Sequence, residues 1–255
     1  WDVLGIGAVA VDDLILVDRY PEVDTKEPVR SRQRYGGGLT GTALVTVSRL
    51  GGLPAYCGAL GDDELSAFAI QEFIREGVNC DNVVREIGGG PIYSIAIIER
   101  FSGRRTLFFD TSGQVAPPLD CITTEMIESS SVLFIDHTMP ELALEVCGIA
   151  HRLGIPVVAD IERAAEVQQN SQVEQLARLG DHVVINLERG RQLSGKNDPP
   201  EIIEFLSQEG QAALVVTNGD QGCWYSELGQ KGVAHCPALD VDVCDTLGCG
   251  YVFDG

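Results

Sequence analysis

The stretch VCDTLGCGYVFDG (Val243–Gly255) has residue types that suit the binding of an anion. Its apolar start predicts a strand, its glycines predict a turn, and the residues after the turn have a helical pattern. Backbone N–H groups at a helix N-terminus attract anions, and small side chains let a phosphate approach them. We therefore expect Gly248, Cys249 and Gly250 to form an anion hole. Tyr251 follows at the position where a carboxylate would serve a proton transfer best.

Polar residues follow several other predicted strands. Ligands of open α/β sheets bind beyond the carboxyl ends of the strands, so we expect these residues to gather at one edge. Each alone is weak evidence, because a strand-end Asp or Asn is often only a helix N-cap. The residues concerned are Asp12 and Asp13, Asp160, Asn186, Thr217 with Gly219 and Gly222 in the following turn, and Asp245 with Thr246.

The order of the predicted strands and helices that would position these residues changes along the chain. The stretches 14–36 and 91–110 contain hairpin-like strands after an acidic break at Asp12–Asp13, whereas strands and helices alternate regularly from about residue 130. Apolar, β-branched strands separated by helices are typical of a parallel sheet covered on both faces. We predict an α/β fold of three layers, α/β/α, with a mainly parallel central sheet and a small β-sheet flap. All of it would form a single domain, 1–255.

Composition narrows the classes of function. The 38 acidic and 18 basic residues give a net charge of −20, which opposes non-specific binding to nucleic acids. No apolar run reaches the ~18 residues of a membrane span, and the acidic N-terminal stretch is unlike a secretory signal. Eight cysteines without a C-x-x-C pair indicate small buried thiols rather than zinc ligands. We expect a cytoplasmic protein that binds neither membranes nor nucleic acids.

The glycines of GIGAVA, from Gly5, invite comparison with dinucleotide-binding loops. The third glycine is missing, no helix is predicted to begin there, and no acid ends a second strand about 20 residues later. A tight strand whose glycines allow close packing is enough to explain the motif. We therefore do not expect a nicotinamide cofactor.

The order of these motifs resembles that of the ribokinase-like (PfkB) family of carbohydrate kinases across essentially the whole chain. It comprises a strand leading to Asp12, YGGGLTGTA before a helix, a two-strand flap, β-α-β units, VVTNGDQGCW and finally DTLGCG. The last motif, with the residue after it, matches six of the seven positions of the family signature D-T-x-[GA]-[AC]-G-D. TNGDQG matches the family's T-x-G-x-x-G nucleotide turn.

The resemblance implies that ATP, with Mg²⁺, phosphorylates a hydroxyl group of a sugar, a related polyol or a nucleoside. Asp12, Gly37, Gly38 and Thr42 would bind this small substrate under the closing flap, and Gly248–Gly250 would hold the transferred phosphoryl group. The residues expected to bind the nucleotide are Asn186, Thr217, Gly219, Gly222, Asp245 and Thr246. A homodimer formed through the flap is a further expectation.

The chain also departs from the family pattern. Tyr251 stands where the family has its catalytic Asp, Thr42 where Asn is common, and Arg189 where the N-x-x-E motif has its Glu. A phenol with a pKa near 10 is a poor base at pH 7. One alternative is therefore a catalytically silent protein that binds sugar or nucleotide. Another is that residues including the Asp are missing between Gly250 and Tyr251. The resemblance also implies a C-terminal helix and loop that the sequence lacks.

Three further features stay open at this stage. Lys26 and the arginines within 30–34 would either recognise an acidic sugar or form a solvated strand face. His137 would either face the substrate or make a structural hydrogen bond. Asp254 could replace the missing base, but it would lie about 5 Å farther along the helix than Tyr251.

Overall fold

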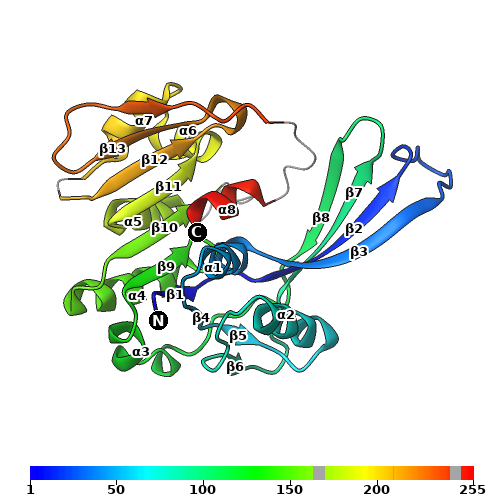
Figure 1. Cartoon of the computed structure of the whole chain (residues 1–255), viewed down its shortest axis with the longest axis horizontal. Coiled ribbons are helices and arrows are strands. Elements are labelled where there is room, and N and C mark those ends of the chain that lie inside the picture. Colours follow the sequence, from blue (N-terminus) through cyan, green and yellow to red (C-terminus); the bar gives the residue numbers. More distant parts are fainter. Residues whose placement is uncertain (163–169, 209, 242–247) are drawn as a thin grey trace.

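A large, mostly parallel sheet forms the body of the computed structural model, which describes residues 1–162, 170–208, 210–241 and 248–255 (Figure 1). Within these residues the strand order is β14-β13-β12-β11-β10-β9-β1-β4. The strands from β12 to β4 are parallel, and β13 and β14 extend the sheet antiparallel. Their bounds are β1 Val3–Ile6, β4 Pro54–Tyr56, β9 Val132–Asp136, β10 Val157–Ile161, β11 His182–Asn186, β12 Ala213–Thr217, β13 Cys223–Glu227 and β14 Ala234–Cys236.

Helices cover this sheet in two groups. α1 (Leu39–Arg49) and α8 (Cys249–Asp254) pack against each other, and α1 also contacts β1 and β4. α4 (Pro140–Leu153) packs on α3 (Thr124–Glu128), α5 (Asn170–Leu179) and β9, while α6 (Leu187–Ser194) and α7 (Pro199–Leu206) pair beside β11 and β12. Apolar side chains of the parallel strands, such as Leu4, Ile135 and Ile185, are fully buried between the layers. The predicted α/β/α fold is confirmed.

A second sheet of four strands forms the flap, which projects from the body (Figure 1). Its order is β3-β2-β7-β8, with β2 Ala10–Val17, β3 Val29–Gly37, β7 Ile92–Glu99 and β8 Arg105–Asp110. α2 (Glu64–Arg75) contacts β2 and β3, and the short strands β5 (Ala59–Leu60) and β6 (Val84–Arg85) pair nearby. The flap thus combines segments that are far apart in the sequence.

The predicted break at Asp12–Asp13 is wrong. β2 begins at Ala10 and runs through both residues, so Asp12 belongs to the flap and does not end a strand of the body. Asp is unfavourable in strands by propensity. Here Asp13 is buried, and Arg34 and Arg32 of the neighbouring β3 pair with its carboxylate. A long-range ion pair overrides the local preference.

Other expectations have mixed outcomes. No helix was predicted to begin after the GIGAVA glycines, and β1 is indeed followed by the flap strand β2. The expectation that the cysteines are buried is wrong for Cys236 and Cys249, which are exposed. The polar helix α6 was not predicted. Among the described helices, none has both the length and the apolar character that crossing a membrane would take.

Candidate active site

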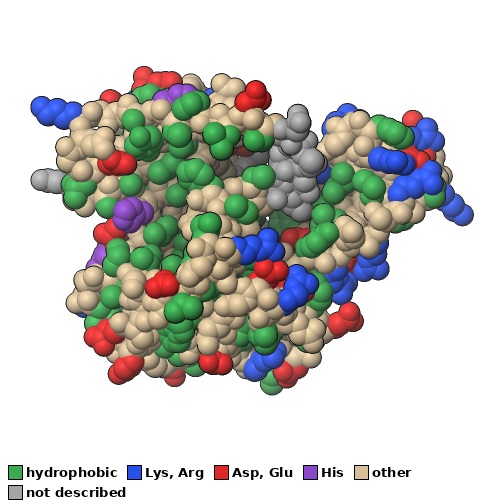
Figure 2. Space-filling view, viewed as in Figure 1, with side chains coloured by type: hydrophobic (Ala, Val, Ile, Leu, Met, Phe, Trp, Pro, Cys, Tyr) green, Lys and Arg blue, Asp and Glu red, His purple; other side chains and the backbone are tan. Residues whose placement is uncertain are grey.

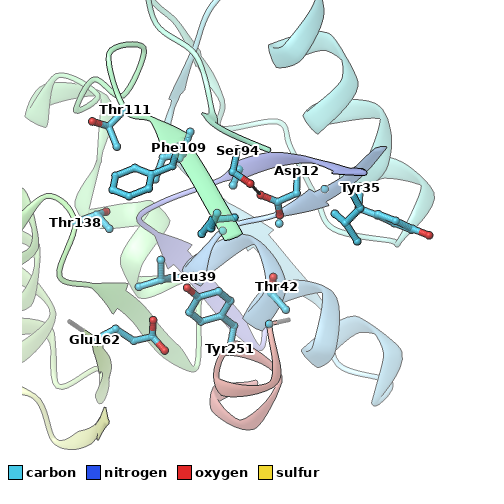
Figure 3. A pocket seen from close by; sticks show the side chains of 18 of the residues that line it. Asp12, Tyr35, Leu39, Thr42, Ser94, Phe109, Thr111, Thr138, Glu162 and Tyr251 are labelled. Atoms are coloured by element: carbon cyan, nitrogen blue, oxygen red, sulfur yellow. Dashed lines mark hydrogen bonds between the residues drawn. The ribbon is translucent and has the colours of Figure 1, made fainter. Parts of the chain in front are cut away.

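A cavity of about 870 Å³ lies between the flap, the loop before α1, the carboxyl ends of β9 and β10, and the start of α8 (Figure 3). It brings together predicted residues from distant parts of the sequence. Those that line it are Asp12, Gly37, Gly38, Thr42, Gly248 and Tyr251. Cys249 and Gly250 are exposed at the start of α8 and are not part of the lining.

Asp12 points into the cavity from β2 (Figure 3). The hydroxyl of Ser94, on the neighbouring strand β7, donates a hydrogen bond to its carboxylate. Burial raises the pKa of Asp12, while the hydrogen bond from Ser94 acts in the opposite direction. The free oxygen of such a carboxylate accepts hydrogen bonds from hydroxyl groups of a ligand.

The glycines before α1 are required by close approach. A Cβ atom at Gly37 would lie 2.2 Å from Oδ2 of Asp12. Gly38 has φ +92°, and a Cβ there would lie 2.6 Å from backbone atoms of Ala8 and Ala10. Gly38 is required by its φ and by its backbone contacts, whereas a side chain at Gly37 would have to displace the carboxylate of Asp12. The loop therefore lies with its backbone against the cavity.

Asp136, at the end of β9, anchors the segment that joins the two sheets. Its carboxylate accepts hydrogen bonds from the backbone N–H of Ala8 (2.6 Å), the hydroxyl of Thr40 (2.7 Å) and the backbone N–H of Thr138 (2.9 Å). This fully hydrogen-bonded carboxylate holds β1, α1 and the loop after β9 in one arrangement. Its role here is to position the cavity walls.

The start of α8 forms the opposite end of the cavity from Asp12. Gly248 precedes the helix with φ +76° and supplies no side-chain cap. Tyr251 faces the cavity, and burial, followed by the carboxylate of Glu162, raises the pKa of its phenol. The phenol therefore stays protonated at neutral pH and is not itself a base.

Sequence reasoning missed Glu162, which follows β10 and lines the cavity next to Tyr251 (Figure 3). Burial raises its pKa, and its hydrogen bond with Tyr251 lowers it. The backbone N–H of Glu162 donates to Nδ1 of His137 (3.2 Å). His137 is buried, also lines the cavity, and has a pKa lowered by burial. The predicted structural hydrogen bond is present, and a position facing the substrate stays a prediction.

Asp160 and Asp254 form a carboxyl pair behind this wall. Each carboxyl group influences the pKa of the other, and Oδ2 of Asp160 and Oδ1 of Asp254 are buried without a hydrogen-bond partner. Burial raises the pKa of Asp160 well above its usual value and that of Asp254 to about 7. Asp254 thus packs toward β10 and does not line the cavity.

Of the residues predicted to bind the nucleotide, those that the structure describes lie at the carboxyl ends of β11 and β12, outside the cavity lining. Asn186 caps α6, because its side-chain oxygen accepts the backbone N–H of Arg189 (2.8 Å). Thr217 ends β12, and Gly219 and Gly222 both have positive φ in the turn that follows. Asp245 and Thr246 lie outside the described residues.

The basic cluster on the flap is largely paired. Arg30 forms an ion pair with Asp18, and Arg32 and Arg34 pair with Asp13. The alternate residues of β3, Ser31 and Gln33, line the cavity instead. Figure 2 shows Lys and Arg side chains gathered over the outer part of the flap. The arginines therefore favour the interpretation of a solvated strand face.

The sequence model described as the pfkB family carbohydrate kinase matches residues 2–253. The chain belongs to the PfkB family of carbohydrate kinases. It is 25% identical to the ketohexokinase of Mus musculus over 99% of this chain and 86% of that protein. It is 27% identical to the aminoimidazole riboside kinase of Salmonella typhimurium, over 90% of this chain and 74% of the relative.

Solved structures agree on the fold of this PfkB protein. The Arabidopsis thaliana ribokinase complexed with ribose and ATP superposes with a TM-score of 0.77 over 98% of this chain and 82% of that one, at 16% identity. The family and the fold make the chain a carbohydrate kinase by class.

Proposed function

We propose that this PfkB protein transfers the γ-phosphoryl group of ATP to a hydroxyl group of a sugar, a related polyol or a nucleoside. One observation carries the proposal: a single cavity joins Asp12, Gly37 and Gly38 at one end to Gly248 and Tyr251 at the other. A hydroxylated ligand and a phosphoryl donor would meet inside it. The relatives named above and the ribokinase bound to ribose and ATP support this choice.

The flap end of the cavity suits a polyol. Asp12 and Ser94 together offer acceptors and a donor, and Ser31 and Gln33 add further polar groups from β3. Leu107 and Phe109 of β8 supply apolar surface over the same space. Sugars present both hydroxyl groups and apolar C–H faces, so this mixture matches them.

The other end suits a phosphoryl group. We propose that backbone N–H groups of Gly248, Cys249 and Gly250 face its oxygens, as the family motif implies. The positive φ of Gly248 and the missing side-chain cap at the start of α8 fit that role. When bound, ATP supplies the phosphoryl group, and the chain positions it and excludes water. Asn186, Thr217, Gly219, Gly222, Asp245 and Thr246 would hold the rest of the nucleotide.

Mg²⁺ accompanies ATP in this proposal. Among the described residues no group of three or more His, Cys, Asp or Glu side chains is arranged to hold a metal ion. That is compatible with Mg²⁺, which usually takes one or two carboxylates together with phosphate oxygens and water. We assign no protein ligand to the metal.

Calorimetric titration and a phosphate-transfer assay test the proposal together. ATP–Mg²⁺ and a panel of ketoses, aldoses and nucleosides are titrated into the protein, and product is then followed for each compound that binds. We expect binding of ATP–Mg²⁺ and turnover of at least one member of the panel. Tight binding of NADH without binding of ATP would contradict the proposal.

The second candidate is a silent protein that binds sugar or nucleotide without turnover. Tyr251 favours it, because a buried phenol with a raised pKa cannot replace a carboxylate base. If the chain is silent for this reason, Tyr251→Asp should raise transfer by up to ~10²–10⁴ without much change in nucleotide affinity. The new carboxylate would lie near Glu162 and Asp160, so we also expect some loss of stability.

We further propose that the homodimer expected from the sequence forms at the β8 edge of the flap. β8 is an edge strand of the four-stranded sheet, and Phe108 is 52% exposed on the face opposite Leu107 and Phe109. Exposed apolar edge strands are pairing sites. Light scattering should show a dimer for the wild type and a monomer for Phe108→Arg.

A further inference from the structure

Among the described residues that line the cavity, only Asp12 and Glu162 carry carboxylates, and they lie at opposite ends. Asp12 is on the flap and is hydrogen-bonded to Ser94. Glu162 lies beside the first turn of α8, because a Cβ atom placed on Gly250 would be 3.0 Å from its Oε1. Of these two carboxylates, Glu162 is the one beside the turn where the phosphoryl group is proposed to sit.

Tyr251 connects Glu162 to the cavity. Both side chains line it, and their labelled positions in Figure 3 are adjacent. Each also shifts the pKa of the other: Glu162 raises that of the Tyr251 phenol, and Tyr251 lowers that of Glu162. A phenol that keeps its proton can donate to Glu162 while its oxygen accepts a hydrogen bond from a ligand hydroxyl. Tyr251 is therefore suited to pass a proton on, although it is no base itself.

The groups around Glu162 favour its service as a proton acceptor. The negative charge of Asp136 raises the pKa of Glu162. Asp160 and Asp254, whose own pKa values are raised, are further carboxyl groups nearby. His137 accepts the backbone N–H of Glu162. His137 is disfavoured as a cation by burial and by Arg189. Burial brings the pKa of Glu162 closer to neutrality than that of an exposed glutamate, which improves a general base.

We propose that Glu162 accepts the proton of the attacking substrate hydroxyl through the hydroxyl group of Tyr251. The inference rests on the proposed kinase function. The substrate oxygen forms a bond to phosphorus as the bond from phosphorus to the ADP oxygen breaks. The substrate proton moves to the oxygen of Tyr251 while the phenol proton moves to Glu162. Glu162 later returns its proton to water, so the step needs no other reactant.

Kinetics over a range of pH test this relay in Glu162→Gln and Tyr251→Phe, with Glu145→Gln on exposed α4 surface as control. Each of the first two should lower kcat by about 10²- to 10⁴-fold with little change in KM. The double variant should lose little more than either single one, because the two groups act as a unit. The acidic limb of the wild-type profile should disappear in Glu162→Gln. Glu162→Asp, which keeps the charge, should recover part of the rate.

A measurement without substrate tests the contact itself. The phenol of Tyr251 is titrated by ultraviolet difference spectroscopy against Tyr251→Phe. In Glu162→Gln it should lose its proton at lower pH than in the wild type, since a neighbouring negative charge is removed. An unchanged titration would overturn the relay. Thermal unfolding of each variant checks that it is folded.

The remaining outcomes separate the two proposals. Wild-type turnover with an unaffected Glu162→Gln overturns the relay and leaves the kinase function standing. Loss of turnover in Glu162→Gln but not in Tyr251→Phe also overturns it, because Glu162 then accepts the proton directly. A Glu162→Gln variant whose turnover is restored by high Mg²⁺ overturns it in favour of a metal role. Wild-type binding of ATP and sugar without any turnover defeats the kinase function itself, and the relay with it.

Discussion

Asp12 and Asp13 are neighbours on β2, yet they lie on opposite faces of the flap sheet, and their pKa values are shifted in opposite directions. Asp12 faces the cavity, where its hydrogen-bond donor is the neutral hydroxyl of Ser94, and burial raises its pKa. Asp13 faces away. Hydrogen bonds from Arg34 and Tyr93 hold its pKa well below the usual range, and Arg32 adds a further bond of 2.7 Å.

The difference shows how one strand serves both binding and stability. A buried carboxylate matched by arginines has its hydrogen-bonding capacity used within the fold, and its partners fix the sheet. A half-buried carboxylate whose partner is a single hydroxyl keeps acceptor capacity for a ligand, at some cost in stability. The alternation of side chains along β2 separates the two roles by one residue.

The largest expected effect comes from removing Asp13, the aspartate that stabilises the flap sheet. Asp13→Ala leaves the partly buried Arg34 with only the exposed Glu64 as a partner, so we expect a loss of about 2–4 kcal/mol in the free energy of unfolding. Chemical denaturation measures it. Arg104→Ala, whose side chain is 79% exposed in its pair with Glu99, is the control and should change stability far less. Equal losses in the two variants would show that burial of Asp13 does not matter.

Asp12→Asn removes the charged acceptor that is proposed to bind sugar hydroxyl groups. We expect sugar affinity to fall about 10- to 100-fold, or ~1.4–2.8 kcal/mol, because a charged acceptor is lost. Stability should stay level or rise, since a buried charge is removed. Calorimetric titration gives the affinity and thermal unfolding the stability. A variant that binds sugar normally but unfolds more easily would reverse the roles given to the two aspartates.

A pH series sharpens the same contrast. The folded pKa of Asp12 is raised, so the ionised acceptor, and sugar affinity with it, should be lost at a higher pH than the one at which an exposed Asp takes up its proton. The folded pKa of Asp13 is lowered, so its stabilisation is present above its unfolded pKa and is lost only at more acidic pH. Folded protein with weakened binding should therefore exist near pH 4.5. In Asp12→Asn, affinity should not vary over this range.

The smallest effect concerns a third carboxyl group, that of the half-buried Asp254, which lies beside the carboxyl group of Asp160. Its folded pKa of about 7 lies above the unfolded value of 3.8, so its stabilisation is present at acidic pH and lost as pH rises through 7. Asp254→Asn should be about 1 kcal/mol more stable than the wild type at pH 8, a shift of a few degrees in Tm. Asp220→Asn, an exposed site, is the control. A wild type equally stable at pH 5 and pH 8 would contradict this account.

Local patterns in the sequence predicted the body of the fold well. The regular alternation from about residue 130 gave β9 to β12 and their helices, because buried parallel strands are continuously apolar. β2 was misread because its compensation is not local: Asp13 is made tolerable by arginines about 20 residues away. α6 was missed because LERGRQLS has too few apolar residues for a clear helical period.

The site was predicted unevenly for similar reasons. Glycine motifs mark positions where the backbone itself is required, and Gly37, Gly38 and Gly248 all line the cavity. Glu162 carries no such mark. It gains its position from the packing of α8 against the end of β10, and no spacing along the chain encodes that contact. Asp160, two residues earlier, was the only local signal.

The anchoring of Ala8 by Asp136 has a mechanical consequence. The hydroxyl of Tyr56 also donates a hydrogen bond to the carbonyl of Gly7 (3.1 Å), and the backbone N–H of Gly41 donates one to the carbonyl of Ala8 (3.1 Å). The segment that leads from β1 into β2 is thus fixed to the body. Two residues after Ala8, Ala10 pairs with both Gly37 and Ile92, so three flap strands leave the body at one level. The level of Ala10, Gly37 and Ile92 is therefore the hinge of the flap. A rotation of the flap about this hinge would move the far ends of β7 and β8 most and Asp12, which lies beside the hinge, least.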